Sequence, residues 1–314
     1  MSHRESINNT TELHSRLIIR ILIRPFLFLT KAIPLSILRT LSLPIMAFFY
    51  VIYPTWRRTT NSNIRHVLGK KTPKWKIHKA SFKIYNNYGK YIADLSHLTH
   101  AEPEKALSLI SKRSGYEHLK EALERGKGAI LLTCHMGNWE LGGVILSKLG
   151  HTVNVVYFPD ASTHLEEERK TFRRTKGVNQ IVLENSNFSP IKMLKALQRN
   201  ELVALQGDKL FYDKGIEVPF FGAPAKFPRG PVLLAMAADA PILPSFIVFN
   251  KDHSYHTIID KPIYMKKTKD REKDLLTNLN NVAAVLEKYI KKYHTQWYCF
   301  SPFWREDAHK THIS

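Results

Sequence analysis

The stretch "GAILLTCHMGNWE" at residues 128–140 joins a short apolar run to a polar turn. The run 129–133 is typical of a strand buried on both faces. Residues 138–150 then follow a helical pattern, with Asn138 as the expected N-cap and Gly150 as the stop. A buried strand that leads directly into a helix is the repeating unit of an α/β fold.

The same alternation continues along the chain after residue 115. It predicts an α/β fold in which crossover helices flank a sheet. We expect strands at 129–133, 152–158, 180–184, 201–208, 241–249 and 254–265. We expect helices at 115–126, 138–150, 164–177, 190–200, 230–240 and 270–293.

The charge balance is strongly basic. The chain has 47 Lys and Arg residues against 27 Asp and Glu residues, which gives a net charge of +20. Such an excess favours a polyanionic partner, either nucleic acid or an anionic membrane. The two cysteines, Cys134 and Cys299, provide neither a disulfide framework nor the spacing of a metal site. Cys134 adjoins His135, so a thiol nucleophile is open, but a small apolar residue at the end of a strand is the simpler interpretation.

The first sixty residues are apolar and interrupted by basic residues. The longest uncharged stretch, 40–56, is slightly shorter than the roughly 20 residues that span a bilayer. Aromatic residues gather at its end, as they do at membrane interfaces. We therefore expect residues 1–60 to form a membrane anchor or interfacial helix and residues 61–314 to form the catalytic domain. A buried core helix is the alternative, and we expect no cleavable signal peptide.

His135 and Glu140 are the candidate catalytic pair. On one continuous helix, five residues at about 100° each would place them about 140° apart, so they could not meet. A bend at Gly137 and Asn138, from the end of the strand into the first turn of the helix, would permit contact. Ligands and chemistry collect at such strand ends in open α/β sheets.

A histidine held by a carboxylate has a defined chemistry. Neutral imidazole takes a proton from a hydroxyl, and the carboxylate fixes the tautomer and stabilises the imidazolium. No serine or cysteine near His135 is well placed as a nucleophile, so the hydroxyl is expected to belong to a substrate. Backbone N–H groups near Gly137, or a nearby arginine, are candidate donors to a negatively charged oxygen that forms during such a transfer. Gly142 and Gly143 within the helix would leave room beside the motif, and close packing of the helix on the sheet explains them equally well.

The chain resembles the bacterial lipid A biosynthesis (lauroyl/myristoyl) acyltransferase family, within the lysophospholipid acyltransferase-like superfamily. The resemblance extends over nearly the whole chain. It is carried by "HMGNWE", "FRRTKGVNQI", "SPIKMLKALQRNELVALQGD", "VPFFGAPAKFPRGPVLLA" and "TQWYCFSPFW", in that order. It implies a glycerolipid-acyltransferase-like mixed sheet flanked by helices, with a membrane-associated segment at the N-terminus.

The resemblance also assigns roles to residues. His135 matches the general base of the family and Glu140 its orienting acid. Arg173 or Arg174 matches an arginine that precedes a glycine, and Asp208 matches a functional aspartate; all three are expected to bind substrate, the arginines through its phosphates. Lys226 and Arg229 precede the helix at 230–240, where a basic pair is a physically sound anion site.

The implied reaction transfers a fatty acyl group from an acyl-carrier-protein thioester, or from acyl-CoA, to a hydroxyl of a lipid A precursor or related glycolipid. We expect no cofactor and no metal. The enzyme would act at the cytoplasmic face of the inner membrane, in lipopolysaccharide biosynthesis. Many lipid A enzymes carry a His-Arg-Arg-like run after a tryptophan near the C-terminus, whereas this chain has "WYCFSPFW", so another phospholipid or glycolipid acceptor stays open.

Three other classes of protein compete with this interpretation. A basic nucleic-acid-binding protein would lack an explanation for the apolar N-terminal segment, and the chain has no zinc-finger, RRM or helix-turn-helix signature. A metallohydrolase would require clustered ligands, and the chain has no H-E-x-x-H motif. A non-catalytic membrane-binding protein with the same fold stays open.

Overall fold

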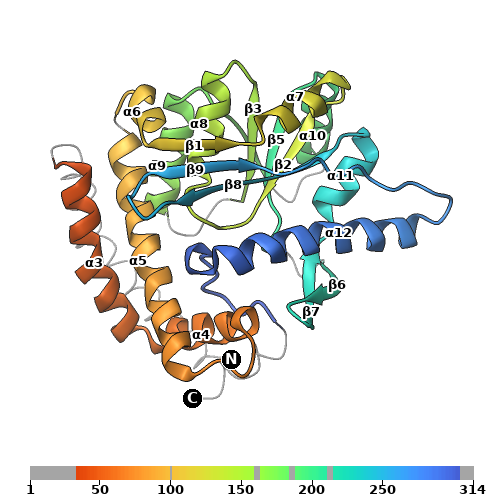
Figure 1. Cartoon of the computed structure of the whole chain (residues 1–314). Coiled ribbons are helices and arrows are strands. Elements are labelled where there is room, and N and C mark those ends of the chain that lie inside the picture. Colours follow the sequence, from red (N-terminus) through yellow and green to blue (C-terminus); the bar gives the residue numbers. More distant parts are fainter. Residues whose placement is uncertain (1–32, 100, 159–162, 184–187, 211–214, 305–314) are drawn as a thin grey trace, which may run out of the picture.

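The structure is a computed structural model of the chain. It describes residues 33–99, 101–158, 163–183, 188–210 and 215–304 (Figure 1). The N-terminal part of the expected anchor, residues 1–32, lies outside the described residues.

A seven-stranded sheet forms the centre of the molecule. In sheet order its strands are β1 (Ile110–Ser114), β9 (Tyr255–Ile259), β8 (Ile242–Phe249), β2 (Ala129–Thr133), β5 (Leu202–Gln206), β3 (Val153–Tyr157) and β4 (Asn179–Val182). Neighbouring strands pair in parallel except β8 and β9, which pair antiparallel. The predicted α/β fold with a mixed sheet and flanking helices is confirmed.

Strand β2 divides the two hydrophobic cores because its side chains alternate between the two faces of the sheet. Ile130 and Leu132 belong to one core, and Ala129 and Leu131 to the other. Helices α10 (Phe188–Gln198), α11 (Gly230–Ala238) and α12 (Arg271–Lys292) contribute to the first core. Helices α7 (Tyr116–Glu124), α8 (Glu140–Lys148) and α9 (Thr163–Thr175) contribute to the second. The end of β2 that leads to His135 is therefore packed against helices on both faces of the sheet.

A separate hairpin and a short helix complete the α/β part. Strands β6 (Gly215–Phe220) and β7 (Ala223–Pro228) pair antiparallel in a sheet of their own, and α6 (Pro103–Ser108) precedes β1. Phe220 lies against Phe227 across the hairpin, with ring centroids 4.9 Å apart, and against Trp304 near the C-terminus. The hairpin thus contributes to the first core.

Three helices precede the sheet. Helices α3 (Leu35–Ile52) and α4 (Pro54–Leu68) lie beside the long α5 (Lys74–Thr99) (Figure 1). A Cβ on Gly89 of α5 would lie 2.5 Å from the Met46 side chain, so this glycine permits α3 to pack closely. Among the described residues, α3 has the length and composition needed to cross a membrane, and only 17% of it is buried. The expected domain boundary at residue 60 falls inside α4.

Candidate active site

His135 and Asp208 meet at the carboxyl ends of two neighbouring parallel strands. Thr133 of β2 and Gln206 of β5 are register partners, and each of the two site residues follows its strand by two positions. His135 Nδ1 lies 2.8 Å from Asp208 Oδ1, and the backbone N–H of His135 donates to Oδ2 at 3.0 Å. The Asp208 side chain is 2% exposed and the His135 side chain 24%, so the imidazole is open to a ligand while its partner is buried.

The C-terminal segment secures this pair. Trp297 follows the 3₁₀ helix η2 (His294–Gln296), is fully buried, and donates its indole N–H to Asp208 Oδ2 at 2.8 Å. The backbone N–H of Tyr298 donates to the carbonyl of His135 at 2.7 Å. Burial of Asp208 opposes its ionisation, but the charge and hydrogen bonds of His135 and the bond from Trp297 outweigh burial, so the pKa of this carboxyl lies below its ordinary value. An ionised Asp208 therefore accepts from Nδ1–H and leaves Nε2 of His135 available as a base.

The turn after His135 depends on Gly137. This residue has φ +60°, and a Cβ would lie 1.8 Å from the carbonyl oxygen of Ile247, so a side chain is excluded. The backbone N–H of Gly137 donates to Gln296, and that of Asn138 donates to Ile247. The N–H groups of His135 and Met136 also have partners within the protein. These four amides are therefore already bonded within the protein, and the expectation of an oxyanion donor near Gly137 stays a prediction.

Asn138 has a different position from the one expected. The residue that caps α8 is Trp139, whereas the Asn138 side chain donates to the Tyr255 hydroxyl at 3.0 Å. That hydroxyl donates to buried Asp94 of α5, which also forms a bidentate ion pair with Arg39 of α3, both contacts at 2.6 Å. The turn after His135 is thus linked to the N-terminal helices through buried polar groups.

Glu140 begins α8 and pairs with Arg173 of α9 instead of His135. Arg173 Nε and Nη2 donate to the two carboxylate oxygens at 2.9 and 2.6 Å, and Trp139 Nε1 donates to Oε1 at 3.1 Å. Burial opposes ionisation of Glu140, but the charge and hydrogen bonds of Arg173 outweigh it and lower the pKa of the carboxyl. The strand–turn–helix bend exists as expected, but the carboxylate that it was expected to bring to His135 points to α9. Spacing along the chain did not identify the true partner, Asp208.

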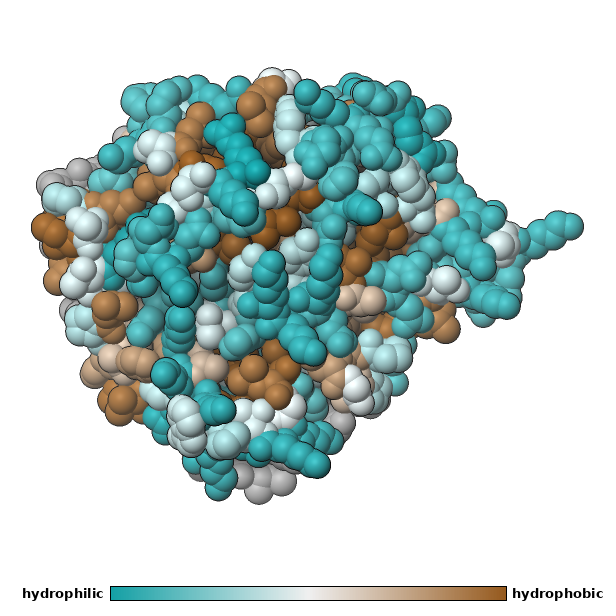
Figure 2. All heavy atoms as spheres, in the orientation of Figure 1, coloured by the Kyte–Doolittle hydropathy of each residue, from teal (hydrophilic) through white to brown (hydrophobic). Residues whose placement is uncertain are grey.

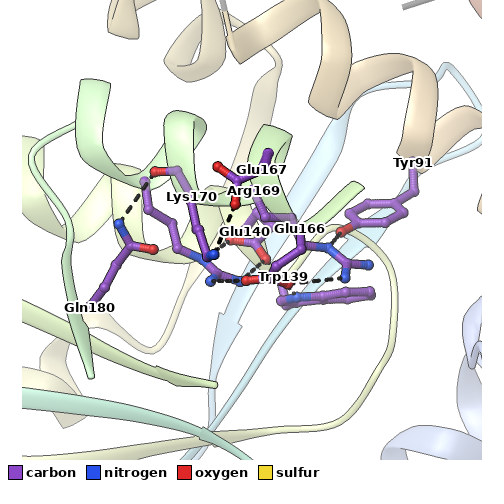
Figure 3. A network of polar contacts seen from close by, with 9 residues as sticks. Tyr91, Trp139, Glu140, Glu166, Glu167, Arg169, Lys170 and Gln180 are labelled. Carbon is purple, nitrogen blue, oxygen red and sulfur yellow. Dashed lines mark hydrogen bonds and ion pairs between the residues drawn. The ribbon is translucent and has the colours of Figure 1, made fainter. Parts of the chain in front are cut away.

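Aromatic and cationic side chains surround this ion pair. Tyr91 stacks on Trp139 with ring centroids 4.5 Å apart, and Arg169 donates to the Tyr91 hydroxyl at 3.2 Å (Figure 3). The Trp139 ring lies 5.4 Å from the His135 ring in an edge-to-face arrangement. Trp139 therefore separates the imidazole from the charged cluster on α9.

The other residues predicted to bind substrate lie in different parts of the structure. Of the two arginines on α9, Arg173 is buried against Glu140, and Arg174 is exposed. Lys226 lies on β7 opposite Glu217 in the hairpin register, and Arg229 is exposed directly before α11. Their predicted role in anion binding stays a prediction. The Cys134 thiol is fully buried, and burial and the nearby Asp208 raise its pKa well above the ordinary value, which makes it a poor nucleophile.

An apolar cavity of about 320 Å³ lies between α8 and the sheet, and its lining includes neither His135 nor Asp208. Thr133 and Gln206 line it at the strand ends that lead to His135 and Asp208. Gly142 and Gly143 line it from α8, in the place where their lack of side chains was expected to leave room. Most of the remaining wall is aliphatic or aromatic: Leu131, Trp139, Ile145, Leu146, Leu149, Val155, Val156, Tyr157, Ala204, Leu205, Phe246, Ile247, Ile258 and Ile259.

Residues 7–306 match the family described as "Bacterial lipid A biosynthesis acyltransferase". The chain belongs to the bacterial lipid A biosynthesis acyltransferase family. The predicted family is therefore confirmed.

Curated relatives of this lipid A acyltransferase family member include "Phosphatidylinositol mannoside acyltransferase" from two strains of Mycobacterium tuberculosis, CDC 1551 / Oshkosh and H37Rv. Each is 29% identical over 171 residues, which is 54% of this chain and 54% of the relative. The protein of that name from Mycolicibacterium smegmatis is 24% identical over 242 residues, 73% of this chain and 72% of the relative. The chain thus spans about half the length of the first curated relatives that it matches.

Proposed function

We propose that this protein is a membrane-associated O-acyltransferase that moves a fatty acyl group from an acyl thioester to a hydroxyl of a glycolipid. The observation that carries the proposal is the hydrogen bond between His135 and Asp208, at the ends of two strands whose last residues, Thr133 and Gln206, line an apolar cavity. The description of the family and the names of the relatives both specify acyl transfer.

In the proposed mechanism, His135 Nε2 takes the proton of the acceptor hydroxyl. The hydroxyl oxygen forms a bond to the thioester carbonyl carbon and gives a tetrahedral intermediate. When this collapses, the carbon–sulfur bond breaks, and the imidazolium returns its proton to the leaving thiolate. Asp208 holds Nδ1–H and stabilises the imidazolium, and Trp297 holds Asp208 in place.

The cavity is the proposed site for the acyl chain. Its wall is almost entirely apolar, and one end lies at the strand termini that carry the base. A chain bound there would place its carbonyl carbon near His135. Arg173 also lines the cavity, but Glu140 holds its guanidinium and Glu166 Oε1 lies 4.0 Å from its Nη1, so the nearby arginine expected as donor to the oxyanion stays a prediction.

We assign the acceptor to the glycolipids as a class. The family is described by lipid A biosynthesis, and the relatives by phosphatidylinositol mannoside. Both descriptions name lipids with sugar hydroxyls. Arg174, Lys226 and Arg229 are the proposed contacts to the phosphates of the acceptor or donor. The proposed acyl donor is acyl-carrier protein or acyl-CoA. The reaction would take place at the cytoplasmic face of the inner membrane.

The experiment compares the full chain with His135→Ala and Asp208→Asn in membranes supplied with acyl-carrier-protein or CoA thioesters. Loss of the general base, or of the carboxylate that sets its tautomer, is expected to lower turnover by about a hundredfold or more. Asp252→Asn removes an exposed carboxylate and serves as the matched control. Mass spectrometry of lipids from cells with and without the protein identifies the acceptor. Near-normal turnover by a folded His135→Ala variant, or an unchanged lipid profile, would overturn the proposal.

A further inference from the structure

The helical layer α3–α5 carries an unbalanced positive charge. Residues 33–93 contain eleven Lys and Arg residues and no Asp or Glu, and the first acid after them is Asp94. Asp94 is buried and already paired with Arg39. The other ten cations lie between Arg57 and Lys90, so the α4 and α5 part of this layer attracts anions.

A basic pocket lies between α4 and α5 in this layer. Its volume is about 450 Å³, and its lining residues are cationic or neutral: Arg57, Arg58, Asn61, Ser62, Arg65, Lys74, Ile77 and His78. Arg58, Asn61, Ser62 and Arg65 follow the i, i+3, i+4, i+7 spacing of one helix face. The opposite face of α4 is fixed, since Asn63 donates to the carbonyls of Cys299 and Ser301 at 3.0 and 2.9 Å. Packing therefore sets which side of α4 faces the pocket.

Contacts to α3 also shape this pocket. Arg57 Nη1 donates to the carbonyls of Tyr50 and Val51, at the end of α3, at 2.9 and 3.3 Å. The Tyr50 hydroxyl lies 3.0 Å from Nδ1 of His78 on α5. The pocket is thus anchored to the C-terminal end of the apolar helix.

Exposed apolar side chains adjoin the basic pocket. Phe48, Val51, Ile52 and Trp56 are 48%, 64%, 51% and 49% exposed. Figure 2 shows brown, apolar side chains along the left margin of the molecule, where α3 lies, beside teal hydrophilic ones. Large apolar residues exposed next to a rim of cations are typical of a surface that enters a lipid headgroup region.

We propose that the α4–α5 pocket binds the phosphate of an anionic phospholipid while the adjoining end of α3 enters the bilayer. A soluble acidic protein or a free phosphate would match the charge but leave the exposed apolar residues unexplained. The inference goes beyond the proposed acyl transfer, because lipid binding requires no turnover. Its test and the test of catalysis therefore fail independently.

Vesicle binding by the full chain tests this inference. The vesicles are phosphatidylcholine alone or phosphatidylcholine with about one-fifth phosphatidylglycerol, and bound protein is measured by sedimentation. Each Lys or Arg at an anionic surface contributes a factor of about five to affinity, so Arg65→Gln combined with Lys74→Gln is expected to weaken binding to anionic vesicles by about 25-fold. Binding to pure phosphatidylcholine should change little.

Two controls decide the outcome. Lys269→Gln with Lys273→Gln removes the same charge beside the N-terminus of α12 and should reduce binding far less. Equal losses for the two double variants would overturn the inference in favour of general charge attraction. Release of the protein by millimolar inorganic phosphate at constant ionic strength would assign the pocket to free phosphate. A defect with acyl-carrier protein but none with vesicles would assign it to an acidic protein, and both of these results overturn the inference.

Discussion

At the scale of single residues, the site contains two buried carboxylates with different partners. Asp208 meets His135, and Glu140 meets Arg173. Replacing one member of a buried ion pair leaves the other charge uncompensated, at a typical cost of about 3–5 kcal/mol. We therefore predict that Glu140→Gln lowers the free energy of unfolding by about 3 kcal/mol at pH 7.

The dependence of this effect on pH has a definite sign. The pKa of Glu140 is lowered in the folded protein, so its stabilising contribution is complete above the ordinary glutamate pKa of about 4.3. That contribution is lost as the pH falls through the lowered folded-state pKa. Urea unfolding at pH 7 and at a series of acidic pH values should show the two proteins converging only below about pH 4. A difference that vanishes already at pH 6 would contradict the assignment to Glu140.

The sequence could locate the residues of the site but not their pairing. His135 and Glu140 are five positions apart, so their spacing suggested a contact. His135 and Asp208 are 73 positions apart and meet only because β2 and β5 are neighbours in the sheet. A crossover that brings two strand ends together leaves no local pattern, although a polar residue two positions after each buried strand is a visible signal.

At the scale of elements, a chain of buried polar residues connects α3, α5 and β9 to the turn after His135. Its members are Arg39, Asp94, Tyr255 and Asn138. Tyr255→Phe removes one hydroxyl and leaves both Asp94 and Asn138 short of a partner. We predict a loss of about 1–3 kcal/mol in the free energy of unfolding. We also expect turnover to fall about tenfold with KM nearly unchanged, because the turn that carries His135 loses a support.

Kinetics and urea unfolding on the same preparation test this prediction. Tyr85→Phe is the matched control, since Tyr85 is also a buried tyrosine but contacts Tyr50 and Phe300 instead of the turn. Tyr85→Phe should lose less stability than Tyr255→Phe, because the Tyr85 hydroxyl makes no hydrogen bond to the turn, and only Tyr255→Phe should lose turnover. Equal turnover in both variants would limit this chain of contacts to a structural role.

The strands differ in how well their bounds can be predicted from the sequence. The buried strand at 129–133 has the bounds expected from its apolar run. Strands β6 and β7 were missed because Pro219 and Pro224 argue against a sheet interior, but a two-stranded hairpin has open edges that accept proline. Strand β1 was missed because its middle residues, Ser111 to Arg113, are polar and exposed at the sheet edge.

At the scale of the whole molecule, the cavity proposed to hold the acyl chain is assembled from distant parts of the chain. Its wall includes strands β2, β3, β5 and β8 and helix α8. In the sequence, only Gly142 and Gly143 indicate a cavity. They do so ambiguously, because a glycine pair in a helix also fits close packing. The proposed acyl site therefore yields a prediction about chain length that depends on the assembled volume.

Ala204 is the residue best suited to test that prediction. It lies on β5, lines the cavity and is small, so Ala204→Phe adds an aromatic ring to a space of about 320 Å³. We predict that this variant keeps turnover with short acyl thioesters and loses at least about tenfold with long ones, since overpacking a cavity excludes the larger ligand first. Turnover measured across a series of donor lengths checks this, and the short donors serve as the internal control for folding. A uniform loss at every length would show that the ring disturbs the sheet, and an unchanged length profile would place the acyl chain elsewhere.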